Sequence, residues 1–297
     1  MTEFHADDYG LFQEQSERIL ECFENGVLNG TSIIANGLEL EQCLQMLPQK
    51  GMDICVHLNL LQGECLAPAE SVPLLVDYNG RFNASFLKLL IAGLTGKREE
   101  YKGQIKAEYR AQINKLLPTF HESNQSLHLD GHAHWHVVPV AFDAMMEVIL
   151  EDDLSVEYIR IPSEPLGFYF RHLFEIMPFH PINIVKALVL KVLCARDCRK
   201  WERELESMER KLFLGVMLSG DFDYRRMSLL LPGAERFAEK KKIGLEILAH
   251  PGSVHKQENL CRVTNRDDLE FFTSPAREEE AKAFTQLRQK NKSLVAR

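Results

Sequence analysis

Short apolar segments alternate with amphipathic helical segments along most of this 297-residue chain. The alternation limits the fold strongly, because a strand, a helix and another strand in succession favour a parallel sheet with helices outside it. The predicted class is therefore α/β, with a sheet that is either open or closed as a barrel. We predict strands over residues 2–7, 31–36, 53–60, 128–136, 156–162, 212–218 and 244–252, and helices over 13–25, 38–47, 85–95, 98–117, 140–150, 182–194, 235–242 and 275–294.

The chain shows no internal repeat, low-complexity tract or interdomain linker. Its length and its 45% hydrophobic residues suffice for one large α/β domain or two ordinary ones. We expect a single domain over residues 1–297, with a helical insertion at about 163–210 and a C-terminal helix at about 275–295. Aromatic residues are dense in the insertion, and packing between inserted helices explains them more simply than a sugar-binding wall does.

Composition excludes several classes of partner. The net charge of −8 provides no basic surface, so we expect no nucleic acid. No apolar run reaches the roughly 18 residues that a membrane span requires, and the first residues do not resemble a signal peptide. Seven cysteines without a CxxC pair argue against a disulfide framework. We therefore expect a soluble cytoplasmic protein, and a homodimer is compatible with the sequence.

The segment 128–136 holds the densest group of ionisable side chains. In a strand, every second side chain points to the same side, so the five polar side chains would share one face. Burying them is costly without a partner, and a divalent metal is the usual partner for imidazole and carboxylate groups. The alternative is a histidine-rich surface tract, but apolar Val137 and Val138, and Pro139 as the expected end of the strand, favour a core element. The five residues are His128, Asp130, His132, His134 and His136.

Other polar residues lie at or near the ends of further predicted strands. Asp7 and Asp8 precede a glycine, where a solvated turn is the simpler explanation, and His57 could be a core histidine with a satisfied hydrogen bond. Arg160 and His250 lie near the ends of two later predicted strands. The carboxyl ends of parallel strands meet at one rim, so we expect these residues and His132 to form one site.

Five segments, in this order, resemble the motifs of the YdjC family of carbohydrate deacetylases. The resemblance implies a (β/α) barrel, distorted or incomplete, related to polysaccharide deacetylases and formed by one domain. It also implies a bound divalent cation, Mg²⁺ or Zn²⁺, and removal of an N-acetyl group from an acetylated amino sugar such as a chitooligosaccharide. The segments are Ala6-Asp7-Asp8-Tyr9-Gly10, Val56-His57-Leu58-Asn59-Leu60, residues 128–136, Arg160-Ile161-Pro162 and His250-Pro251-Gly252.

Carried over by position, the resemblance makes Asp8, His57 and His132 the metal ligands, Asp7 the general base and His250 the general acid. Three protein ligands would leave coordination positions for water and for the acetyl carbonyl oxygen. An amine leaving group must be protonated as it departs, and a histidine suits that task.

The neighbouring residues have more than one expected role. Arg160 could hold Asp7 ionised through a bidentate pair, or form a structural salt bridge. Asp130 and His134 are expected to fix the tautomer of His132, and His136 either contacts substrate or belongs to the core. His5 stands where members of the resembled family often carry Asn. We attach no function to it.

Two other functions fit the same residues. A metal-dependent phosphoesterase also uses histidines and carboxylates, but such sites often hold two metals and add basic residues, and this rim offers chiefly Arg160. A non-catalytic sugar- or metal-binding protein would need neither Asp7 nor His250. Residues 163–240 carry no motif, so we expect the choice of substrate to depend on them.

Overall fold

The computed structural model describes residues 2–261, 263 and 266–295. Its seven strands form one sheet in the order β5-β4-β3-β2-β1-β7-β6, and every neighbouring pair is parallel. This confirms the α/β class predicted from the alternation. The strands are β1 (Thr2–Tyr9), β2 (Gly30–Ile33), β3 (Asp53–Leu58), β4 (Leu127–Gly131), β5 (Val156–Ile159), β6 (Lys211–Leu214) and β7 (Gly244–Ala249).

The sheet curls until its two edge strands approach each other. An isolated parallel bridge pairs Tyr158 of β5 with Glu209, which lies just before β6. The Glu209 N–H donates to the Glu157 carbonyl at 2.7 Å, but no ladder joins the edges in the described part of the chain. The result is the incomplete barrel that the resemblance predicted.

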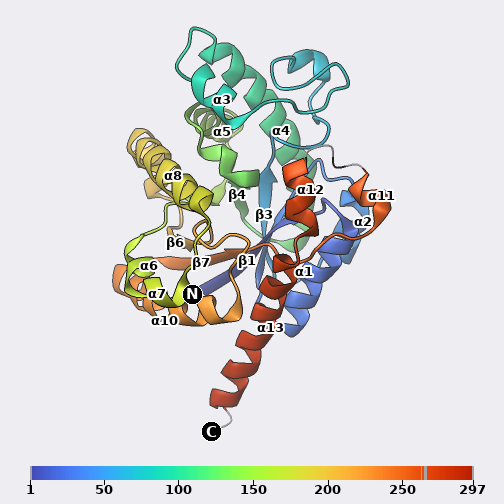
Figure 1. Cartoon of the computed structure of the whole chain (residues 1–297). Coiled ribbons are helices and arrows are strands. Elements are labelled where there is room, and N and C mark those ends of the chain that lie inside the picture. The colour runs from blue at the N-terminus through green and yellow to red at the C-terminus, as the bar shows by residue number, and fades with distance from the viewer. Residues whose placement is uncertain (1, 262, 264–265, 296–297) are drawn as a thin grey trace.

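Helices cover the outside of the curled sheet (Figure 1). Four of them, α6 to α9, lie between β5 and β6, where the insertion was expected. No described helix combines the length and the apolarity that crossing a bilayer requires. The helices are α1 (Gln13–Asn25), α2 (Leu40–Met46), α3 (Phe86–Ala92), α4 (Arg98–Ser123), α5 (Pro139–Glu151), α6 (Gly167–Arg171), α7 (Leu173–Ile176), α8 (Pro181–Lys200), α9 (Glu202–Glu206), α10 (Tyr224–Lys241), α11 (Gln257–Leu260), α12 (Arg266–Thr273) and α13 (Ala276–Val295), with short 3₁₀ turns at Ala69–Ser71 and His132–Val137.

Strand β1 lies inside the sheet, between β2 and β7, and is buried on both faces, as parallel strands usually are. Phe4 packs edge-on against Phe284 of α13, with ring centroids 6.1 Å apart. Glu3, His5 and Asp7, at alternate positions, contact polar groups from other strands inside the curl. Helices therefore pack on the outer face of β1, and the inner face carries ionisable side chains.

The prediction of a strand through residue 136 was wrong beyond Gly131. Ala133 and His134 have φ of +49° and +61°, so the chain turns and residues 132–137 do not alternate across a strand. Pro139 begins α5 instead of ending a strand, which suits its missing N–H. Gly131 is needed for close approach, because a Cβ there would lie 2.7 Å from His136 Nδ1.

Candidate active site

The carboxyl ends of the strands surround a cavity of about 650 Å³. Asp7 and Asp8 lie at the end of β1, His57 in β3, and His132 and His250 just after β4 and β7. The fold thus brings together residues that lie up to 243 positions apart in the sequence. The predicted site residues that line the cavity are Asp7, Asp8, His57, His132, His134 and His250; Asp130, His136 and Arg160 are buried but are not among its lining residues.

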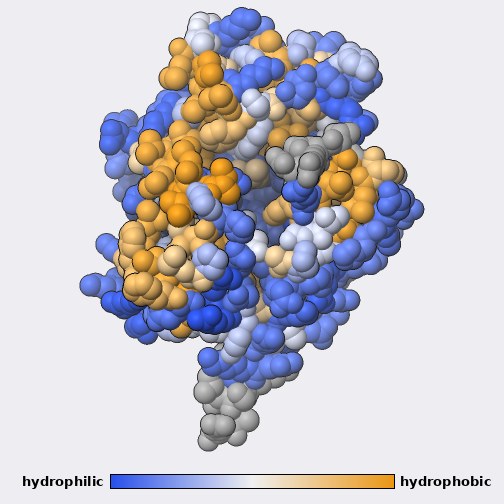
Figure 2. Space-filling view, in the orientation of Figure 1, coloured by the Kyte–Doolittle hydropathy of each residue, from blue (hydrophilic) through white to orange (hydrophobic). Residues whose placement is uncertain are grey.

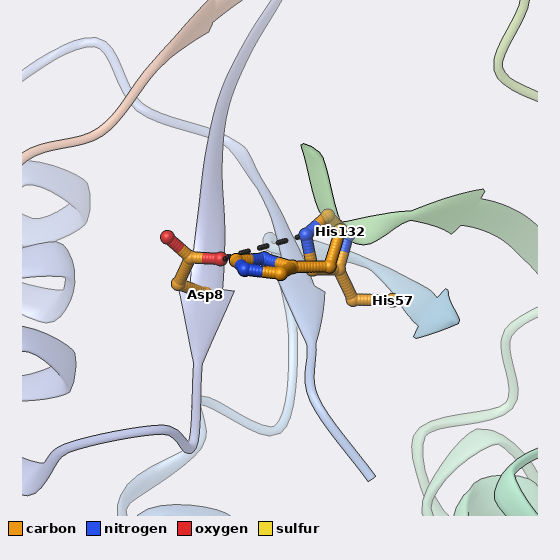
Figure 3. A group of neighbouring side chains, drawn as sticks. All are labelled: Asp8, His57 and His132. Carbon is orange, nitrogen blue, oxygen red and sulfur yellow. Dashed lines mark hydrogen bonds and ion pairs between the residues drawn. The ribbon is translucent and has the colours of Figure 1, made fainter. Parts of the chain in front are cut away.

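Asp8 directs its carboxylate toward the two histidines that were predicted with it as metal ligands (Figure 3). Its Oδ1 is 2.8 Å from His132 Nδ1 and 3.5 Å from His57 Nε2. Asp8 has a φ of +73°, a conformation that a residue with a side chain rarely adopts. Such backbone strain is typical of functional sites, and here it accompanies the turn that leads the chain out of β1.

The chemistry of this group fits a divalent cation. One carboxylate oxygen and two imidazole nitrogens lie within 4.8 Å of one another, and Asp8 Oδ2 and His57 Nε2 are buried without a hydrogen-bond partner. The described interior also holds more acidic groups than permanent cations, since Arg160, Lys211 and Arg277 are near five buried carboxylates. A cation would satisfy the unpaired atoms and offset that charge. The carboxylates belong to Glu3, Asp7, Asp8, Asp130 and Glu246.

Asp130 fixes the orientation of His57. One Asp130 oxygen is 2.6 Å from His57 Nδ1, which leaves Nε2 directed at Asp8. The other oxygen accepts from the Ser32 hydroxyl at 2.5 Å and lies 2.6 Å from Arg160 Nη1. Asp130 thus contacts His57, whereas the sequence had suggested His132. A carboxylate behind a ligand histidine is a common way to set its tautomer.

The same contacts shift the pKa values of both partners. Burial would raise the pKa of Asp130, but Arg160 and His57 hold it well below its usual range. Burial would lower the pKa of His57, yet Asp130 and Asp7 raise it to about 10. The surrounding carboxylates therefore favour positive charge at this position, which a bound cation would supply in place of a proton on His57.

Arg160 binds three carboxylates while fully buried. Its Nη1 lies 2.9 Å from both oxygens of Asp7, and its Nε donates to Glu246 Oε1 at 2.7 Å. The predicted pairing of Arg160 with Asp7 is therefore present, although a single guanidinium nitrogen makes it. The guanidinium also stabilises the buried Glu246, so it has a structural part in the same network.

A second line of polar contacts continues from Asp130 toward the other end of the curled sheet. His5 Nε2 is 2.6 Å from the Ser32 hydroxyl, and His5 Nδ1 is 2.6 Å from Glu3 Oε1. Lys211 donates to Glu3 Oε2 at 2.5 Å. Sequence reasoning gave no role to this group; its signal is a set of polar residues at alternate positions inside apolar strands.

His250 lines the cavity in a loop that α13 holds in place. The His250 N–H donates to Glu280 Oε2 at 2.6 Å, and Arg277 Nε donates to the Gly252 carbonyl at 2.7 Å. The His250 Nδ1 has no hydrogen-bond partner. Burial lowers the pKa of His250 to about 4, against the opposing effect of Asp7 and Asp8. The imidazole therefore rests in its neutral form at neutral pH.

His134 and His136 point in different directions because of the turn after β4. His134 lines the cavity, and its ring centroid is 5.5 Å from that of Phe213. His136 is fully buried, with Nε2 2.8 Å from the Arg160 carbonyl oxygen. Burial lowers the pKa of both, that of His136 to about 4. The position of His136 agrees with the core role that was one of its two expected roles.

Parts of this chain are similar in sequence to deacetylases from other organisms. A Danio rerio carbohydrate deacetylase is 27% identical over 162 residues, which are 54% of this chain and 49% of that protein. A Thermoanaerobacter pseudethanolicus carbohydrate deacetylase is 30% identical over 54% of this chain and 61% of its own length. A chitooligosaccharide deacetylase of Yersinia enterocolitica is 26% identical over 76% and 87%. The match thus spans about half the length of the Danio rerio relative.

A structural similarity and a family match cover more of the chain than these sequence alignments do. A solved Enterococcus faecalis protein named for cellobiose-phosphate cleavage has the same fold, with a TM-score of 0.68 over 98% of this chain and 92% of that protein, at 16% identity. The model of the family described as YdjC-like protein matches residues 3–291. Because this match covers almost the whole chain, the chain belongs to the YdjC family.

Proposed function

We propose that this protein is a metal-dependent hydrolase that removes an N-acetyl group from an acetylated amino sugar. The observation that carries the proposal is the placement of Asp7 beside the Asp8, His57 and His132 group, with His250 lining the same cavity. The names of the deacetylase relatives support this reaction. A protein that only retained a metal would need neither Asp7 nor His250.

Asp8, His57 and His132 are the residues that would hold the cation. A divalent cation bound there, Mg²⁺ or Zn²⁺, would polarise the acetyl carbonyl oxygen and make a neighbouring water more acidic. Asp130 would keep His57 Nε2 directed toward the ligand position through its 2.6 Å contact with Nδ1.

Asp7 is the proposed general base. As the water oxygen bonds to the amide carbon, the carboxylate of Asp7 accepts the proton that the water loses. Arg160, 2.9 Å from both Asp7 oxygens, keeps that carboxylate aligned.

His250 is the proposed general acid. The carbon–nitrogen bond breaks as the sugar nitrogen receives a proton, giving acetate and a free amine. A resting pKa of about 4 means that His250 is not protonated beforehand at neutral pH. Negative charge that develops on the substrate beside the ring raises this pKa, so the imidazole takes up a proton from solvent and passes it to the departing nitrogen.

The insertion supplies one wall of the cavity, which supports a role in choosing the substrate. Val185, Lys186, Val189 and Leu190 of α8 line it, as do Phe86 and Trp135. Apolar and aromatic side chains of this kind can pack against sugar rings, while Lys186 can donate to a hydroxyl.

The test is mass spectrometry of a panel of acetylated amino sugars and N-acetylglucosamine oligomers after incubation with the protein and Mg²⁺ or Zn²⁺. We expect loss of one acetyl unit and release of acetate from at least one substrate. Phosphate release from generic phosphate esters, without acetate release from any sugar, would contradict the proposal in favour of a phosphoesterase. Metal binding without either product would leave only a binding protein.

A further inference from the structure

Two helices beside the cavity expose apolar side chains to solvent. On α8 these include Leu188 and Val192, the latter 69% exposed, and beside α3 they include Leu94, which is 85% exposed. Figure 2 shows apolar atoms gathered over α8, over α6 and α7, and over α3. We call this set the apolar rim: Leu87, Ile91 and Leu94 near α3; Phe170, Phe174 and Met177 near α6 and α7; and Ile182, Ile184, Val185, Leu188, Val189 and Val192 on α8.

Helix α8 is more apolar than its burial requires. Its fully buried positions form one narrow stripe, at Asn183, Ala187, Leu190, Leu193, Cys194 and Asp197. A helix that is apolar around most of its circumference is normally covered on those faces. Exposed apolar surface of this extent marks an interaction site in a folded protein.

The apolar rim is also the basic part of an acidic protein. From Leu166 to Lys200 the chain has six arginines and lysines and only two acidic residues, although its net charge is −8. Residues 85–98 contain Lys88, Lys97 and Arg98 and no acidic residue, and of these Arg98 pairs with Glu99 and Asp143. Lys191 and Arg199 are exposed on α8 among the apolar positions. Apolar side chains interspersed with lysine and arginine are characteristic of helices that lie on anionic membranes.

The apolar rim is continuous with the cavity. Val185 and Val189 belong to both, and Phe86, at the first position of α3, lines the cavity from the other side. Phe86 packs edge-on against Trp135, with ring centroids 6.2 Å apart. The exposed residues of α3 and α8 therefore flank the cavity mouth on two sides.

The charges decide between possible occupants. A second copy of this chain on the same face would bring its lysines and arginines against like charges, which disfavours binding. Nucleic acid would leave the apolar side chains without contacts. An anionic lipid surface suits both the basic and the apolar side chains of the apolar rim. Its headgroups attract the cations, and its acyl boundary accepts the apolar side chains.

We propose that the apolar rim docks on an anionic lipid bilayer, so that the cavity mouth opens at the headgroup level. Helix α8 then lies along the surface, and no part of the described chain crosses the membrane. The docking does not depend on the proposed deacetylase reaction, since it involves neither Asp7 nor the Asp8, His57 and His132 group.

The experiment is flotation of the full chain with vesicles of phosphatidylcholine alone and of phosphatidylcholine mixed with phosphatidylglycerol. We expect binding to the mixed vesicles, weaker binding at high salt, and little binding to phosphatidylcholine alone. The double variant Leu188→Glu/Val192→Glu should lose binding, and Lys191→Glu/Arg199→Glu should weaken it at least tenfold. None of these four residues lines the cavity.

Leu150→Glu is the matched control, because Leu150 is 55% exposed at the far end of α5 from the cavity. It should bind like the unaltered chain. Circular dichroism and turnover of a soluble acetylated sugar show that each variant is folded. Absent binding to mixed vesicles, binding that Leu188→Glu/Val192→Glu leaves intact, or equal loss in Leu150→Glu would overturn the proposal. A dimer that dissociates in Leu188→Glu/Val192→Glu, without vesicle binding, would assign the face to a second copy instead.

Discussion

At the scale of single residues, the site separates groups that face the cavity from groups that fix them. Asp8, His57 and His132 present unpaired or mutually directed atoms, while Asp130 and Arg160 are buried behind them. Each of the two sets should therefore respond differently to substitution. Loss of a cavity-facing group removes a chemical function, and loss of a buried partner releases the group that it holds.

Asp7→Asn should abolish base function while leaving the cation ligands in place. We expect turnover to fall by about 10²–10⁴-fold, with metal content unchanged by elemental analysis. His132→Ala is the contrasting variant and should lower metal content. Unchanged turnover in Asp7→Asn would refute the base assignment.

Asp130→Asn should weaken metal binding by about 10–100-fold, because its 2.6 Å contact fixes His57. Titration with Zn²⁺ measures the affinity. Asp143→Asn is the matched control, since Asp143 is equally buried but pairs with Arg98 and Arg196. Equal losses of affinity in the two variants would show a general effect of removing a buried carboxylate.

At the scale of elements, the site depends on a helix that contributes no residue to the reaction. Glu280 of α13 accepts the N–H groups of His250 at 2.6 Å and of Gly220 at 3.1 Å. Two loops that follow different strands are thus tied to one carboxylate. The loop that carries His250 has its position fixed by α13 from outside the sheet.

Glu280→Ala should therefore free the His250 loop and leave buried N–H groups unpaired. We expect a stability loss of about 1–3 kcal/mol and a lower kcat, measured by denaturant unfolding and by acetate release. Glu279→Ala changes the neighbouring exposed residue, which pairs only with Lys282 among the contacts described for it, and should change neither quantity. Full activity in Glu280→Ala would show that His250 needs no such support.

The sequence predicted where the strands and helices lie better than it predicted where their side chains point. Strand and helix alternation located β3, β7 and α1 closely, because burial of parallel strands leaves continuous apolar runs. The turn at Ala133 and His134 was missed, since alternating histidines match a strand and nothing local shows the close approach of Gly131 and His136. The line from Glu3 through His5 and Ser32 was missed as well. Its members meet only after the sheet has curled.

At the scale of the whole molecule, stability should depend on pH through buried neutral histidines. Burial lowers the pKa of His136 to about 4 from its ordinary 6.5. Between these values the unfolded chain binds more protons than the folded one, so stability falls as pH falls from 6.5 toward 4.

His136→Gln should reduce that acid sensitivity by up to about 1.4 kcal/mol per pH unit. Glutamine can still donate to the Arg160 carbonyl, which His136 Nε2 contacts at 2.8 Å. Urea unfolding from pH 7 to pH 5 measures the slope. His121→Gln, at an exposed position of α4, should leave it unchanged. A slope that is the same in His136→Gln and the unaltered chain would assign the acid sensitivity to other groups.

The strand order also has a consequence for synthesis on the ribosome. β1 carries Asp7 and Asp8, but one of its two neighbours is β7, more than 200 residues later. Asp7 and Asp8 are synthesised first, but β1 cannot pair with β7 until nearly the whole chain has been translated. A polypeptide released before β7 also lacks His250, the proposed general acid, so we expect no deacetylation by such a fragment.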